Sequence, residues 1–131
     1  MITDRVGDFI IRLQNAALVG KREVTVPYSA HLVAVAKKLK ELGFIDQVEV
    51  PADGAKKAFT VALAYDGLGA ARLRGVKRVS KPGRRLYAHA TAAHRVKGGT
   101  GARIISSSKG IISDAEARSL HMGGEELFEI W

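Results

Sequence analysis

The sequence has no cysteine, only three prolines and a single tryptophan. Without cysteine the chain can have neither a disulfide framework nor a thiolate zinc site, and it suits a reducing compartment. No apolar run approaches the roughly 20 residues that a membrane-spanning helix needs. The N-terminal segment MITDRVGDF carries acidic residues early, so we expect neither a secretory signal nor a transit peptide. With 131 residues, 47% hydrophobic and 26% charged, the composition indicates one ordinary globular domain or two small ones.

Acidic residues are missing from a long internal stretch. Between Asp66 and Asp114 there is no aspartate or glutamate, while 11 lysines and arginines occur there. Residues 1–66 hold 9 Lys and Arg against 8 Asp and Glu, whereas residues 67–131 hold 12 against 5. A surface that serves only solubility mixes its signs, but a one-signed field suits a polyanion, which releases counterions on binding. The pattern therefore favours a nucleic-acid partner over an ordinary basic face.

Hydrophobic periodicity and turn signals predict an α+β fold made of two small domains. Residues 1–66 are expected to form an N-terminal domain with the order α-β-α-β-β. A Gly- and Ala-rich connection at 67–75 leads to residues 76–131, which are expected to form a mainly β domain with one short helix. Asp4 and Ser29 are suitable N-caps, and Ser113 with Glu116 forms a capping box. The predicted helices are 4–18, 29–42 and 113–120, with a weak helical turn at 91–97; the predicted strands are 23–27, 44–50, 58–65, 76–80, 84–90, 102–106, 111–112 and 126–131.

The stretch RIISSSKGIISDAEA, residues 103–117, places three serines, a lysine and a glycine between two strand-like runs. Ser106 and Lys109 have the S-x-x-K spacing in which a lysine can activate a serine nucleophile. That chemistry needs both residues one turn apart on a rigid helix. The β-branched run before them and Gly110 after them favour a strand or a loop instead. A small serine–lysine hydrolase is therefore the alternative from another functional class, and the leading expectation is a protein that is not an enzyme.

Two other interpretations of this stretch involve phosphate or nucleic acid. A Walker motif needs G-K-[ST] at the start of a helix, but here the order is Ser-Lys-Gly between two strand-like runs. Serine hydroxyls both donate and accept hydrogen bonds, Lys109 adds a charge, and Gly110 allows close backbone approach. Such a loop suits the shallow minor groove of RNA, whereas the simplest alternative is a plain β-turn with exposed serines. Beside the acid-free stretch, we expect RNA contact.

Four stretches resemble one known family: DFIIRLQNA (8–16), SKPGRRLY (80–87), GGTGARIISSSKGIISDAEA (98–117) and GGEELFEIW (123–131). In order and over the whole chain, they are similar to the small-subunit ribosomal protein eight family (the bacterial S-eight type). That family has an S-T-S-K-G loop, a [ST]-D-x-x-A helix start and a G-G-E strand at its C-terminus. The sequence departs from the family at Ser107, which replaces the central threonine of the loop, and at Gln14, which replaces an arginine.

The resemblance implies a two-domain structural constituent of the small ribosomal subunit, in a cytoplasmic or an organellar ribosome. It implies direct binding to a helical, internally bulged element in the central domain of small-subunit rRNA, mostly through residues 76–131, and stabilisation of that RNA during assembly. Neighbouring small-subunit ribosomal proteins are the other implied partners. Carried over to this chain, the RNA-binding residues are Ser106, Ser107, Ser108, Lys109, Gly110, Tyr87, Lys81, Arg84, Arg85 and Glu125.

Two members of this set have particular implied roles. The Tyr87 ring could stack on a base or a sugar, and the Glu125 carboxylate could accept a hydrogen bond from a base amino group. We expect no metal and no cofactor, because the four histidines lack ligand spacing. An RNA-binding translational repressor that acts on mRNA is the alternative function. Period-two alternation in the last strand predicts that Glu125 and Glu129 share one face and that Glu126 points to the other.

Overall fold

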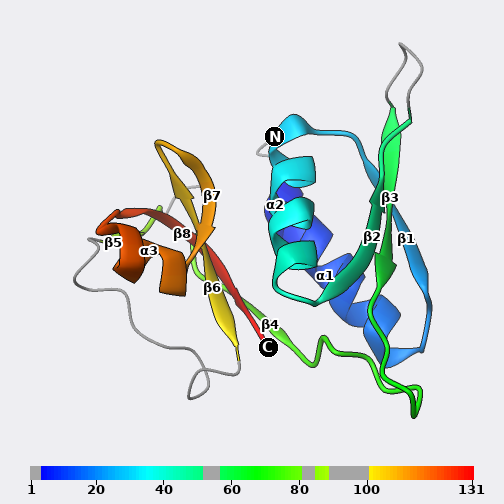
Figure 1. Cartoon of the computed structure of the whole chain (residues 1–131). Helices are drawn as coiled ribbons and strands as arrows, with labels where there is room; N and C mark the ends of the chain where they lie inside the picture. Colours follow the sequence, from blue (N-terminus) through cyan, green and yellow to red (C-terminus); the bar gives the residue numbers. More distant parts are fainter. Residues whose placement is uncertain (1–3, 52–56, 81–84, 89–100) are drawn as a thin grey trace. The chain divides into compact units, whose positions relative to one another are not determined.

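The computed structural model describes residues 4–51, 57–80, 85–88 and 101–131 of the chain (Figure 1). The chain divides into two compact units, one made of Asp8–Arg74 and the other of Met1–Gly7 with Gly75–Trp131. Among the described residues there are three helices and two antiparallel sheets, so the predicted α+β class is confirmed. None of these helices is long and apolar enough to cross a membrane. The domain boundaries at residues 66 and 76 stay a prediction.

The first unit places two helices on one face of a three-stranded antiparallel sheet (Figure 1). Its elements are α1 (Arg5–Leu18), β1 (Glu23–Pro27), α2 (Ala30–Glu41), β2 (Ile45–Glu49) and β3 (Ala58–Leu63). The strand order is β1-β3-β2, and alternate residues of β3 are buried, as expected when one face of a sheet is covered. The ring centroids of Phe9 and Phe59 lie 6.1 Å apart, which joins α1 to the core of the sheet.

Local sequence signals set the ends of both helices. The Gly7 N–H donates to Asp4 Oδ1 at 3.0 Å, and the Leu32 N–H donates to the Ser29 hydroxyl at 3.5 Å. Both predicted N-caps are therefore confirmed. α2 ends before Gly43, whose φ of 89° belongs to the left-handed region in which glycine is favoured.

The described part of the second unit contains a five-stranded antiparallel sheet and one short helix. Its elements are β4 (Val76–Arg78), β5 (Tyr87–Ala88), β6 (Ala102–Ser107), β7 (Gly110–Ser113), α3 (Asp114–Leu120) and β8 (Gly124–Ile130). β8 is central, because β6 pairs with it on one side and both β4 and β5 pair with it on the other. Ile105, Ile112 and Ala117 form a buried cluster between α3 and the sheet. The predicted capping box of Ser113 and Glu116 is confirmed at the start of α3.

Three predicted elements of this unit differ from the structure or lie outside the residues that it describes. Of the predicted strand at 84–90, the described residues contain only β5, and the predicted helical turn at 91–97 lies outside them. The last strand begins earlier than predicted, at Gly124, because Gly124 pairs with Ala88 of β5. Pairing between distant strands therefore sets the start of β8.

The pairing of β8 with β6 contains an irregularity that the sequence prediction missed. Between Ile104 and Ile105 of β6, the register skips one residue of β8, Leu127. Such a bulge inserts an extra residue and shifts the alternation of side chains beyond it. Glu126 and Glu129 consequently lie on the same face of the sheet, and the prediction that they point to opposite faces was wrong.

Candidate nucleic-acid interface

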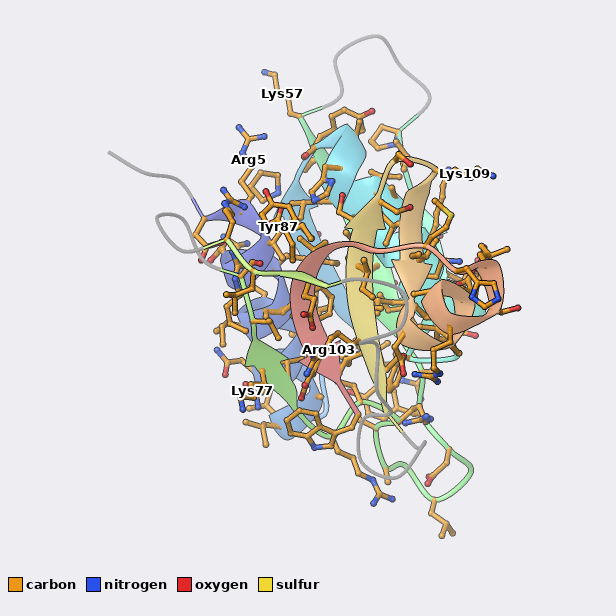
Figure 2. All side chains as sticks on the ribbon, turned by 90° about the vertical axis from the view of Figure 1, so that its left-hand side faces the viewer. Arg5, Lys57, Lys77, Tyr87, Arg103 and Lys109 are labelled. Carbon is orange, nitrogen blue, oxygen red and sulfur yellow. The ribbon has the colours of Figure 1, made fainter. Side chains whose placement is uncertain are left out.

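The serine stretch forms a tight hairpin between β6 and β7. Ser106 and Ser107 end β6, Ser108 and Lys109 form the turn, and Gly110 begins β7 with a φ of 116°. The Ser107 hydroxyl donates to the Gly110 carbonyl oxygen at 2.8 Å and accepts the Lys109 N–H at 3.2 Å. Ser107 therefore closes the turn through its own side chain. The side chains of Ser108 and Lys109 are exposed at the tip, where Figure 2 labels Lys109.

This geometry does not provide the arrangement that a serine–lysine nucleophile needs. Ser106 lies in a strand and Lys109 lies in a turn, so the two are not one helical turn apart on a rigid helix. Ser106 instead pairs with Ile111 of β7 on one side and with Glu125 of β8 on the other. The S-x-x-K spacing here belongs to a β-hairpin.

Four side chains lie in one row across the end of the second sheet. Tyr87 of β5 pairs with Glu125 of β8. Glu125 pairs with Ser106 of β6, which in turn pairs with Ile111 of β7. Directly paired residues of antiparallel strands project to the same face, so these four form what we call the cross-strand row, beside the hairpin turn. Ile105, which alternates with Ser106, packs under α3 on the opposite face.

Tyr87 is the most exposed member of the cross-strand row, with 71% of its surface accessible. An uncovered aromatic ring offers an apolar face on which a base or a sugar can stack. Beside it, Glu125 Oε2 lies 3.0 Å from Arg85 Nη1. The arginine compensates the charge of this carboxylate, so the row presents a ring, a hydroxyl and an acceptor without an unpaired negative charge.

A buried serine holds the chain on both sides of residues 81–84. Ser80 is fully buried, and its hydroxyl accepts the Leu86 N–H at 2.9 Å and donates to the Leu86 carbonyl oxygen at 3.2 Å. The Glu126 N–H also donates to the Leu86 carbonyl oxygen, at 2.8 Å. These bonds determine the position of the next residue, Tyr87. Sequence reasoning missed Ser80, whose only signal is a small polar residue before the sequence K-P-G.

Gly124 allows β6 and β8 to approach closely at the row. A Cβ atom on this residue would lie 2.3 Å from the Ser106 carbonyl oxygen and 3.0 Å from Ile105 Cγ2. No larger residue fits such a contact with a neighbouring backbone. The glycine was part of the G-G-E pattern in the sequence, but a structural role for it could not be derived without the strand pairing.

Several cations of the acid-free stretch bind carboxylates from other parts of the chain. Arg78 Nη2 lies 2.6 Å from Asp4 Oδ1, and Arg103 binds two glutamates of β8, as Arg85 binds a third. The stretch has no acids in its sequence, but the folded chain brings acids from elsewhere against these three arginines, so the one-signed field expected from the sequence is not present there. The predicted contacts Lys81 and Arg84 lie outside the described residues.

Arg103 is held between Glu126 and Glu129 on the face of the sheet that carries α3 (Figure 2). Burial by itself lowers the pKa of Arg103, but its hydrogen bonds to Glu129 and Glu126 outweigh burial and raise that pKa above its ordinary value. Its charge is thus satisfied within the sheet. Lys77 and Lys109, in contrast, have exposed side chains (Figure 2) that can reach phosphates.

Comparison with known proteins adds an independent observation. The family model of Ribosomal protein S8 matches residues 4–131. The small ribosomal subunit protein uS8 of Sorangium cellulosum is 43% identical over 132 residues, which cover 100% of both chains. The corresponding protein of Brevibacillus brevis is 39% identical over 131 residues, 100% of this chain and 99% of that one. The small ribosomal subunit protein uS8c of Thalassiosira pseudonana is 38% identical over 132 residues, again 100% of both chains.

Proposed function

Because the chain belongs to the ribosomal protein S8 family, we propose that it binds directly to a bulged helical element in the central domain of small-subunit rRNA. Proteins of this family are structural components of the ribosome and not enzymes, so the serine–lysine hydrolase is excluded. The chain works in the small ribosomal subunit with rRNA and other ribosomal proteins as partners. Its binding stabilises the rRNA domain during assembly.

The cross-strand row beside the hairpin turn is the observation that carries the proposal. It brings Tyr87, Glu125 and Ser106, which come from three different strands, onto one face. The turn residues Ser108 and Lys109 follow directly after β6. Six of the proposed RNA contacts are therefore neighbours on three strands and one turn: Ser106, Ser107, Ser108, Lys109, Tyr87 and Glu125.

Each of these groups has a chemical role that suits RNA more than DNA. The minor groove of an RNA helix is wide and shallow and exposes 2′-hydroxyls, which the hydroxyls of Ser106 and Ser108 can contact by donating or accepting. An internal bulge leaves bases unstacked, and one such base can stack on the Tyr87 ring, a contact worth about 1–3 kcal/mol. Lys109 adds a charge for a phosphate. Ser107 supports this surface by closing the turn.

Contacts within the chain position the cross-strand row in the absence of RNA. Ser80 forms two hydrogen bonds with Leu86 and so positions Tyr87. Arg85 forms an ion pair with Glu125, and Gly124 permits the close approach of β6 and β8. A surface that is already ordered loses less conformational entropy on binding. An mRNA that folds like the rRNA element would meet the same groups, and this is how a translational repressor would use the surface.

The proposal is tested with a salt titration of binding to a central-domain rRNA fragment that contains the bulged helix, and to a plain RNA duplex of equal length. The first variant is Tyr87→Leu, which keeps apolar bulk and removes the aromatic face. The second is the double change Ser106→Ala with Ser108→Ala, which leaves the turn-closing Ser107 in place. Leu120→Ala, at an exposed position of α3, is the matched control.

We expect the wild-type chain to prefer the bulged fragment and Tyr87→Leu to weaken that complex by about 10-fold, the effect of one lost stacking contact of about 1.4 kcal/mol. The slope of affinity against salt should stay near its original value, because no cation is removed. The Leu120→Ala variant should bind as the wild type does. Equal binding of both RNAs by all variants would mean that positive charge alone drives binding, and the proposed role of the row would be wrong.

A further inference from the structure

A groove lies between α1 and the free edge of β1 in the first unit. Its hollow has a volume of about 650 Å³. No residue proposed above to bind RNA belongs to this unit. The groove is lined by Arg12, Asn15, Ala16, Val19, Lys21, Glu23, Val24 and Thr25, and we call it the α1–β1 groove.

The helical side of the groove carries one strongly exposed apolar residue, Val19, with 77% of its surface accessible. Val19 directly follows α1, and Ala16, about one turn before it, also lines the groove. Ile11 and Leu18 of α1 are exposed as well, but they lie outside the lining. An apolar side chain left in water indicates a protein partner more than an RNA partner, because RNA presents phosphates, sugars and aromatic bases rather than aliphatic surface.

The other wall of the groove is the edge of a sheet with unused main-chain groups. Among the strands that the structure describes, β1 pairs only with β3. The Leu63 N–H donates to the Arg22 carbonyl and the Tyr28 N–H to the Lys57 carbonyl, so by alternation every second residue of β1 bonds to β3. The main-chain groups of Glu23 and Thr25 point to the open side.

A side chain of α1 already uses one of these groups. Arg12 Nη1 donates to the Thr25 carbonyl oxygen at 3.2 Å, which shows that this carbonyl faces the groove. Among the described residues no hydrogen bond joins the N–H of Glu23 or Thr25 to a partner on this side. Pro27, the last residue of β1, has no N–H. Open strand edges of this kind pair readily with an added strand.

The charges of the groove fit a protein segment that carries an acid. Arg12 is already bound to Asp8 at 3.0 Å. Among the described residues Lys21 has no ion-pair partner, so it is the lining cation that remains for a carboxylate of the partner, beside the acid Glu23. A polyphosphate backbone would need several such cations. An extended protein segment matches these features, because its main chain bonds to the strand edge, its apolar side chains contact Ala16 and Val19, and one acid reaches Lys21.

We propose that the α1–β1 groove docks an extended segment of a neighbouring ribosomal protein as an added strand on the edge of β1. The inference rests on the proposed function only for the source of the segment, which is the small subunit. Val19 and Ala16 would contact apolar side chains of the segment, and the main-chain groups of Glu23 and the N–H of Thr25 would bond to its main chain.

The test places the photoreactive amino acid p-benzoylphenylalanine at position 19 of the full chain. The control carries it at Leu68, which is 96% exposed and lies in the same unit outside the groove. Each chain is assembled into small subunits with rRNA and the remaining small-subunit proteins, irradiated, and the linked molecule is identified by mass spectrometry. We expect position 19 to link to a single short segment of one protein, and position 68 not to link to that segment. A link from position 19 to rRNA, or no link, overturns the proposal.

Hydrogen exchange of the β1 amides gives a second readout with matched variants. Exchange should be at least 10-fold slower in the assembled subunit than in the free chain. Val19→Asp should abolish that slowing, whereas Leu68→Asp should keep it, and both should bind the rRNA fragment as the wild type does. Equal β1 exchange rates in the free and assembled chains overturn the groove proposal.

Different results would refute the proposed function and the groove proposal. A chain that does not bind the rRNA fragment and stays out of the particle contradicts the proposed function. In that case the photoreactive chain is mixed with the small-subunit proteins without RNA, and the absence of a link from position 19 in that mixture overturns the groove proposal separately.

Discussion

The change Gly124→Ala tests the packing that supports the cross-strand row. An alanine Cβ would lie 2.3 Å from the Ser106 carbonyl oxygen, whereas even close C–H···O contacts keep carbon and oxygen about 3.3 Å apart. The contacted atom belongs to the backbone of a strand paired on both sides. It cannot turn away as a flexible side chain would, so β6 and β8 must separate by about 1 Å.

We expect Gly124→Ala to lower the free energy of unfolding by about 1–3 kcal/mol, the typical effect of overpacking a folded core. With an m-value of about 2 kcal/mol per molar urea, the midpoint of unfolding should fall by about 0.5–1.5 M. Tryptophan fluorescence is a suitable probe, because Trp131 is the only tryptophan and its ring lies against Gly75. The signal therefore reports on the unit that contains β8.

The matched control is Gly67→Ala, at a glycine whose added Cβ would meet no atom within 4 Å. We expect its free energy of unfolding, obtained from the urea midpoint, to stay within about 0.5 kcal/mol of the wild-type value. If Gly124→Ala unfolds at the same urea concentration as Gly67→Ala, the close approach of β6 and β8 is not the reason for glycine at this position. The support that we ascribe to the cross-strand row would then be wrong.

Three further predictions concern single side chains. Arg103→Met should lower the free energy of unfolding by about 3 kcal/mol in urea, because it leaves Glu126 and Glu129, which are 12% and 15% exposed, without their cation; an unchanged midpoint contradicts this. Ser107→Ala should cost about 1 kcal/mol through its two lost hydrogen bonds, while Ser108→Ala should cost less, and equal midpoints for the two variants would refute the turn-closing role. Hydrogen bonds from the N–H groups of Ala70 and Leu68 lower the pKa of Asp66 below 3.8. This stabilisation is present above pH 3.8 and is lost as the pH falls through the lower folded value, so NMR titration of the Asp66 carboxyl carbon should give a midpoint under 3.8; a midpoint at or above 3.8 contradicts the loop geometry.

Much of the fold could be predicted because its signals are local. The caps at Asp4 and Ser29 and the box of Ser113 with Glu116 each involve residues three positions apart, so their chemistry is readable along the chain. The extent of β5 and the start of β8 were less accessible. They depend on which distant strands pair, and no local pattern contains that information.

The charges too could be read from the sequence only in part. The acid-free stretch correctly indicated a nucleic-acid partner, because the distribution of charge can be read from the sequence alone. It could not tell which arginines are available to RNA. The partners of Arg78 and Arg103 come from the first residues and from β8, and the extra residue Leu127 brings Glu126 and Glu129 to the same face.

The sequence by itself determined the α+β class and the family, which follow from periodicity and motifs along the chain, and the hairpin that carries the serines, which follows from one short segment. Only the tertiary structure decided that Gly124 permits the strands to meet and that Tyr87, Glu125 and Ser106 share a row. The physical reason is register: the face and the neighbours of a side chain in a sheet depend on hydrogen-bonded pairing with strands that lie far away along the chain.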